Sequence, residues 1–102
     1  LNLADGGSTV LPAPAIGLNF KFIVATAPTT AYTIDTNGGA DIMHGTWIDI
    51  VGELTYFTAA DIFSFLASAS PVGDSLDVVS DGTSWFCSAR SGANTGVSTG
   101  QT

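Results

Sequence analysis

Glycine and proline interrupt the chain at short intervals, and this spacing constrains the fold more than any other feature. Pro12 and Pro14 follow a short apolar run, Gly17 precedes the next run, and residues 37–39 are Asn-Gly-Gly. Proline removes a backbone donor, and glycine permits the positive φ angles of tight turns. Between the interruptions, apolar and polar residues alternate, as they do in strands with one buried face. We therefore expect short strands joined by tight turns.

The clearest predicted strand spans residues 18–26. Its apolar face consists of Leu18, Phe20, Phe22 and Val24. Further strands are predicted at 9–11, 32–34, 42–44, 47–54, 61–67, 75–79 and 84–89. Within 55–66, residues 59–63 are also compatible with a helical turn, but the Ile, Phe, Tyr and Thr content favours a strand. Asp81-Gly82 is the strongest hairpin signal. The side chains expected to face the core are Phe63, Phe65, Leu76, Val78 and Trp85.

Short strands at this spacing predict an all-β fold. We expect a small antiparallel β-sandwich of the jelly-roll type, with a partly closed barrel as the alternative. The 102 residues are enough for one core. Small polar residues dominate both ends of the chain. We therefore predict an N-terminal arm at 1–8, the sandwich at 9–90 and a flexible or partner-ordered tail at 91–102.

The charge composition excludes several classes of partner. Only 2 residues are Lys or Arg, charged residues make up 11% of the chain, and the formal net charge is -7. So few cations argue against nucleic acid and anionic membrane surfaces as partners. One cysteine excludes an internal disulfide. The polarity comes from Ser, Thr, Asn and Gly instead, which suits either a subunit packed against others or an all-β extracellular or virion module.

Residues 73–76 spell Gly-Asp-Ser-Leu, a tetrapeptide known from a family of serine esterases. A nucleophilic serine needs a base within hydrogen-bond reach. No histidine follows the tetrapeptide, and the chain's one histidine, His44, lies upstream. Asp74 and Asp77 are neighbouring acids on a predicted exposed turn. We therefore interpret this stretch as a turn that leads into a strand, and predict no catalytic residues.

Residues 35–41 alternate oxygen donors in the manner of a calcium loop. Calcium takes six to eight oxygens, and Glu53 is too distant in sequence to complete the set, so a solvated turn is expected. His44 lacks partners at the spacing of metal ligands. Cys87 has no cation nearby in sequence and is expected to be a small buried hydrophobic residue. We predict no metal-binding and no cofactor-binding residues.

Aromatic side chains offer one possible binding function. Trp47 is the better candidate for stacking on a sugar, since Trp85 follows a hairpin turn in a core-facing register. Tyr32 and Tyr56, with nearby Asp residues, complete the hypothetical glycan site.

Several short motifs follow one another in a definite order along the chain. The order begins with Leu11-Pro12, Gly17 and a strand of the form Phe-x-Phe-x-Val at 20–24. There follow Tyr32-Thr33-Ile34, Ile42 before His44-Gly45, Phe63-Ser64-Phe65, Pro71, Gly73-Asp74 and the stretch 80–86. Taken together, these motifs resemble a recurrent β module of tailed-phage virion proteins, and the similarity spans about residues 9–88, most of the chain.

This resemblance implies a virion structural protein without enzymatic activity. A small chain without a shaft fits a head decoration (cement) protein that binds the outer surface of the capsid and stabilises the shell. The expected partners are the major capsid protein and further copies of the chain, with a homotrimer favoured. The alternative is a fibre or spike module that binds a host receptor or glycan.

Overall fold

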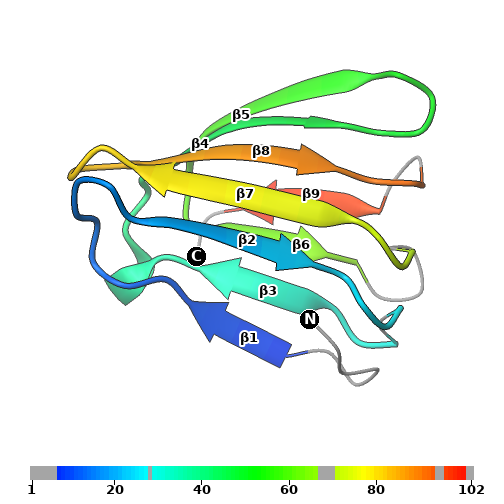
Figure 1. Cartoon of the computed structure of the whole chain (residues 1–102), viewed down its shortest axis with the longest axis horizontal. Helices are drawn as coiled ribbons and strands as arrows, with labels where there is room; N and C mark the ends of the chain where they lie inside the picture. Colours follow the sequence, from blue (N-terminus) through cyan, green and yellow to red (C-terminus); the bar gives the residue numbers. More distant parts are fainter. Residues whose placement is uncertain (1–6, 28, 67–70, 94–95, 101–102) are drawn as a thin grey trace.

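The alternating residues form short strands, which assemble into two sheets packed face to face (Figure 1). The computed structural model describes residues 7–27, 29–66, 71–93 and 96–100. The strands are β1 (Gly7–Val10), β2 (Asn19–Ile23), β3 (Tyr32–Asp35), β4 (Met43–Ile48), β5 (Leu54–Ala60), β6 (Ile62–Phe65), β7 (Ser75–Ser80), β8 (Trp85–Arg90) and β9 (Val97–Gly100), with a 3-10 helix η1 at Asn37–Gly39. Within these ranges, no helix is long and apolar enough to cross a membrane.

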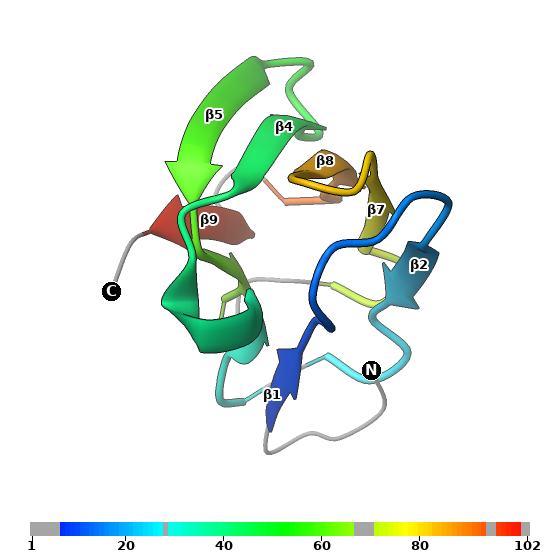
Figure 2. The ribbon, with the colours of Figure 1, turned by 90° about the vertical axis from the view of Figure 1, so that its left-hand side faces the viewer.

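The predicted all-β sandwich is confirmed, with one correction to its strand directions. One sheet has the order β1-β3-β6-β9 and the other β2-β7-β8-β4-β5. β1 pairs with β3 and β4 pairs with β8 in parallel, so the sheets are mixed and not purely antiparallel. Parallel neighbours need long connections, which local alternation does not reveal. Over the described residues the two sheets form a sandwich and not a closed barrel; Figure 2 shows β4, β5 and β8 in the layer above β1.

The chain passes from one sheet to the other between β5 and β6. Ala59 has a positive φ of 54°, and its N–H donates to Nδ1 of His44 at 3.0 Å. The backbone N–H of Asp61 then donates to the carbonyl of Gly100 at 3.0 Å, and its carbonyl accepts from Thr36 N–H at 3.0 Å. The bend therefore ends pairing in the five-stranded sheet and begins pairing in the four-stranded sheet.

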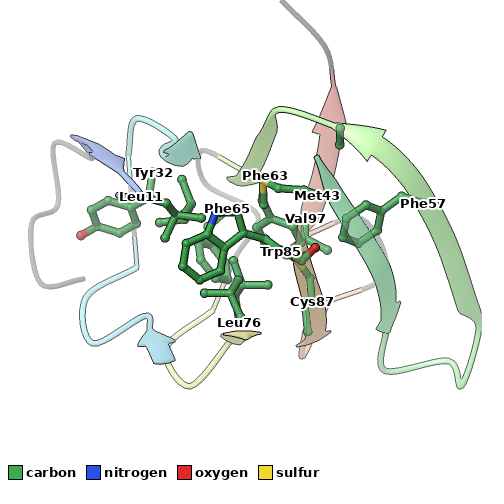
Figure 3. Close-up of a cluster of buried hydrophobic side chains, with 14 of the residues drawn as sticks. Leu11, Tyr32, Met43, Phe57, Phe63, Phe65, Leu76, Trp85, Cys87 and Val97 are labelled. Carbon is green, nitrogen blue, oxygen red and sulfur yellow. Dashed lines mark hydrogen bonds between the residues drawn. The ribbon is translucent and has the colours of Figure 1, made fainter. Parts of the chain in front are cut away.

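Aromatic side chains fill the space between the sheets (Figure 3). The predicted core residues Phe63, Phe65, Leu76, Val78 and Trp85 are each at most 1% exposed. The ring of Phe63 on β6 lies 6.2 Å from that of Phe57 on β5 and 5.3 Å from that of Phe65. Such pairs contribute about 0.5–1.5 kcal/mol beyond their buried area. These contacts join the two halves of the strand that changes sheets.

The Asp81-Gly82 hairpin is confirmed between β7 and β8. Oδ1 of Asp81 accepts from the N–H groups of Ser84 and Thr83, both at 2.9 Å. Because these two donors favour the carboxylate, they hold the pKa of Asp81 below its usual value. Gly82 supplies a positive φ of 99°.

The predicted strand at 47–54 is wrong, because a turn at 49–53 separates β4 from β5. Oδ1 of Asp49 accepts from Val51 N–H at 3.1 Å and from Glu53 N–H at 3.2 Å. Gly52 adopts a φ of 78°, and its N–H donates to the carbonyl of Asp49 at 3.0 Å. The apolar Ile50 continues the alternation through the turn and hides it in the sequence. We call residues 49–53 the β4–β5 turn.

The prediction for the chain ends is also corrected. Residues 97–100 of the predicted tail form β9, in which Val97 is buried opposite Phe65 on β6. Gly7 and Ser8 of the predicted arm belong to β1. Backbone pairing with distant strands orders these small polar segments. The rest of the arm (1–6), residues 94–95 and 101–102 of the tail, and residues 67–70, where a predicted strand ends and a loop begins, lie outside the described residues.

Gly45 on β4 allows β4 and β8 to approach each other, and this generates a prediction. A Cβ at Gly45 would overlap the backbone carbonyl of Cys87. Gly45→Ala should therefore lower the free energy of unfolding by about 2 kcal/mol or more, measured by urea denaturation. Gly100→Ala is the matched control, because a Cβ there meets no atom within 4 Å, and should change stability by less than about 0.5 kcal/mol. Equal effects of the two substitutions would contradict the packing argument.

Candidate functional site

The outer face of the five-stranded sheet is the main candidate for binding. The registers place its outward side chains in three rows across the strands. The first row is Asn19, Val79, Phe86 and His44; the second is Lys21, Asp77, Ser88, Thr46 and Tyr56; the third is Ile23, Ser75, Arg90, Ile48 and Leu54. We call this surface the five-stranded face.

Large apolar side chains gather on the five-stranded face. Ile23, Ile48, Leu54, Tyr56, Val79 and Phe86 are each between 41% and 69% exposed. Single exposed apolar residues are normal on a soluble protein, but several on one sheet face form a patch of the kind that partners cover.

Both cations of the chain also lie on this face. Lys21 is on β2 and Arg90 on β8, whereas the chain as a whole carries 9 acidic residues. Nζ of Lys21 lies 3.9 Å from Oδ1 of Asp77, and both side chains are more than half exposed. Such an exposed pair contributes at most about 1 kcal/mol. The five-stranded face is therefore the one sheet face that combines apolar side chains with positive charge.

A shallow open groove of about 510 Å³ runs over β2, β7 and β8 on this face. Its outward lining residues are Asn19, Lys21, Asp77, Val79, Phe86 and Ser88. We call it the β2–β8 groove. Val79 and Phe86 contribute apolar surface to its lining, and Lys21 and Asp77 contribute opposite charges.

The outer face of the four-stranded sheet has a different chemistry. Ser8, Thr33, Ser64 and Ser98 lie opposite one another in a row across β1, β3, β6 and β9. We call this surface the hydroxyl face. A second outward row of this face holds Val10, Asp35, Ile62 and Gly100, of which Val10 is 60% exposed. The hydroxyl face has fewer large exposed apolar side chains than the five-stranded face and neither of the two cations, so the two outer faces differ in chemistry.

The structure does not bring the esterase-like tetrapeptide together with a base. Asp74 is buried, and its carboxylate accepts from Ser91 Oγ at 2.7 Å and from Gly92 N–H at 2.8 Å. Ser75 lies on the five-stranded face in a different row from His44. Nδ1 of His44 is within 2.7 Å of Thr58 Oγ1, in addition to its bond from Ala59. Asp74 therefore ties the start of β7 to the chain after β8.

The candidate calcium loop at 35–41 is a compact turn. Thr36 Oγ1 donates to the carbonyl of Ala40 at 2.6 Å. Oδ2 of Asp35 accepts from Ser8 Oγ at 3.3 Å, and η1 occupies the middle of the loop. Among the described residues, no group of three or more His, Cys, Asp or Glu is placed to hold a metal ion.

The three aromatic residues of the hypothetical glycan site do not share a surface. Trp47 faces inward, with its ring 5.7 Å from that of Phe57 and 6.3 Å from that of Phe63. Tyr32 is 2% exposed in the core, and Tyr56 is 69% exposed on the five-stranded face. Of the three, Tyr56 alone is positioned to contact a partner.

The sequence reasoning missed the β4–β5 turn as a surface feature. Ile50 and Val51 in this turn are each more than 60% exposed, as is Leu54 at the start of β5. The signal available in the sequence was Asp49 three residues before Gly52, a pairing suited to a turn in which the Asp side chain accepts from following N–H groups.

Asp74 provides a test of the buried contacts near β7. Asp74→Ala should lower the free energy of unfolding by about 2–3 kcal/mol, because Ser91 Oγ and Gly92 N–H lose their acceptor. Asp77→Ala removes the same side chain at an exposed position and should cost less than about 1 kcal/mol. Urea denaturation of both variants measures the difference, and similar losses would contradict the assignment.

Cys87 provides a second test, through its ionisation. Burial raises the pKa of the Cys87 thiol from 9.0 to about 12, and the residue is 7% exposed. Since a thiolate is the reactive species, the native thiol should react with a disulfide reagent at pH 8 only as fast as the protein opens. The stability contributed by the neutral thiol should be complete below pH 9 and lost between pH 9 and about 12. Cys87→Ala should lack this part of the pH dependence, and rapid native labelling would contradict the burial.

Comparison of the chain with protein-family models, curated proteins and solved structures yields no match. A functional conclusion therefore depends on the geometry and chemistry of the chain's own residues.

Proposed function

We propose that the chain is a non-enzymatic virion structural protein, a head decoration protein that binds the outer capsid surface and stabilises the shell. The observation that carries this proposal is the contrast between the two outer faces of the sandwich. The five-stranded face presents six large exposed apolar side chains together with Lys21 and Arg90, whereas the hydroxyl face presents a row of serine and threonine beside a row in which Val10 is exposed. A subunit that buries one face against a partner and exposes the other face to water needs two faces of different chemistry.

The residues weighed for chemistry support the same proposal. Asp74, His44 and Cys87 are engaged in hydrogen bonds or buried in the core. In these environments the three side chains stabilise the sandwich.

The stabilising effect follows from binding linkage. A protein that binds only the assembled shell shifts the equilibrium toward that shell by an amount set by its concentration and affinity. Tyr56 and Leu54 on β5 are the most exposed apolar side chains of the five-stranded face. This part of the face is our candidate for the capsid contact.

The test is to mix the purified chain with heads assembled from the major capsid protein encoded with it but lacking decoration. We expect saturable binding and a higher melting temperature of the shell. Tyr56→Asp should weaken the affinity for the heads by about tenfold or more, because a charge in the buried centre of an interface costs at least about 1.4 kcal/mol.

Ser98→Asp is the control, since it adds the same charge on the edge strand β9 of the hydroxyl face. It should leave occupancy unchanged, and near-native melting temperatures must be verified for both variants. Absence of wild-type binding to the heads would overturn the proposal. Specific binding to host glycans without head binding would instead support the fibre or spike alternative.

A further inference from the structure

The loop between β3 and β4 carries an asparagine followed by two glycines at its tip. Asn37, Gly38 and Gly39 form η1, and all three are exposed. The two glycines have positive φ angles of 69° and 71°, which residues without a Cβ adopt most readily. Among the 102 residues, Asn37 is the one asparagine that precedes a glycine. We call residues 36–42 the β3–β4 loop.

The base of the β3–β4 loop is held more firmly than its tip. Thr36 is 2% exposed, and its Oγ1 donates to the carbonyl of Ala40 at 2.6 Å. The N–H of Gly39 donates to the carbonyl of Thr36 at 3.3 Å, which is beyond the roughly 2.7–3.2 Å usual for such a bond. The peptide that joins residues 37 and 38 can therefore rotate when this one weak bond opens.

The two groups that could react with each other at the tip are not engaged elsewhere. Within the described ranges, neither the side chain of Asn37 nor the backbone N–H of Gly38 has a hydrogen-bond partner. A Cβ at Gly38 would meet no atom within 4 Å, so the space around its nitrogen is open. Asn19 differs on each count, because its Nδ2 donates to the carbonyl of Gly17 at 3.3 Å and β2 pairs it with β7.

We propose that Asn37 is a site of spontaneous deamidation. The backbone nitrogen of Gly38 loses its proton to hydroxide and attacks Cγ of Asn37, which closes a five-membered succinimide ring. The side-chain nitrogen takes a proton from water and leaves as ammonia. Water then opens one of the two carbonyl–nitrogen bonds of the ring, which gives aspartate or isoaspartate at residue 37. The reacting atoms belong to adjacent residues, so the attack is intramolecular, and glycine offers it no side-chain hindrance.

The modification changes the charge and the backbone of an exposed loop. Either product adds one negative charge between Asp35 and Asp41, in a chain whose formal net charge is already -7. Isoaspartate also places one extra carbon in the main chain at the tip, outside the bond from Thr36 to Ala40 that holds the base. The inference does not depend on the proposed function, because it requires only the folded chain and water.

Timed incubation of the purified full chain under native conditions tests the proposal. Peptide mass spectrometry should detect the change from amide to acid at residue 37, and an isoaspartyl methyltransferase should label part of the product. The rate should rise by about tenfold per pH unit between pH 7 and pH 9, because the attacking nitrogen must lose a proton. The peptide with Asn19 from the same digest is the internal control and should keep its amide. Equal conversion at both positions would overturn the assignment.

The same chain unfolded in urea separates the effect of the loop structure from that of the sequence. At equal pH and temperature, the folded protein should react within about tenfold of the unfolded rate, because opening of the exposed tip costs little free energy. A folded protein that reacts more slowly than this would show that the loop protects Asn37, and the proposal would fail.

A conservative variant tests the ring closure itself. Asn37→Gln keeps the amide but needs a six-membered ring, so it should acquire negative charge at least about tenfold more slowly in ion-exchange chromatography. Asn37→Asp carries the charge of one product from the start and marks its elution position. A gain of charge in Asn37→Gln as fast as in the wild type would place the modification at another residue.

Discussion

The bend between β5 and β6 is the constraint on which the rest of the sandwich depends. One strand pairs with β4 up to Ala60 and with β3 and β9 from Ile62 onward. The two sheets are therefore covalently joined along a shared strand, and the backbone of Asp61 anchors the junction to Gly100 and Thr36. Phe57 and Phe63 then face the same interior from either side of the bend. The acceptor on His44 and the positive φ of Ala59 belong to this junction, which gives the chain's one histidine a structural purpose.

The two layers fixed by that bend expose different chemistry to their surroundings. The inward positions of both sheets are mainly apolar, as a sandwich requires. The outward positions differ. A row of hydroxyl groups crosses the four-stranded sheet beside a row with Val10, Asp35 and Ile62, whereas six large exposed apolar side chains and both cations lie on the five-stranded face. A chain with only 11% charged residues could have distributed its cations anywhere. Their location beside the exposed apolar groups is the observation from which we proposed a role in assembly.

Local alternation and turn chemistry predicted much of the fold. The inward register of Phe63 and Phe65 and the hairpin at Asp81 followed from a period of two and from an Asp-Gly pair. The β4–β5 turn was missed because Ile50 continues an apolar pattern through it. β9 was missed because it is ordered by pairing with β6, and a short polar segment contains no local pattern that predicts such pairing. The candidate surface required both the registers and the strand order, since each exposed side chain is unremarkable in isolation.

The parallel pairing of β4 with β8 has a consequence for how the protein is made. Met43 lies opposite Trp85, so the centre of the five-stranded sheet is completed by a strand that is synthesised well after β4. Until then, the β4–β5 hairpin has no neighbour on the β8 side, and Trp47 has only part of its packing. Contacts so distant in sequence slow folding. The β4–β5 hairpin is therefore made before the strand that completes its sheet, and its inward side chains are fully buried only once β8 has been added.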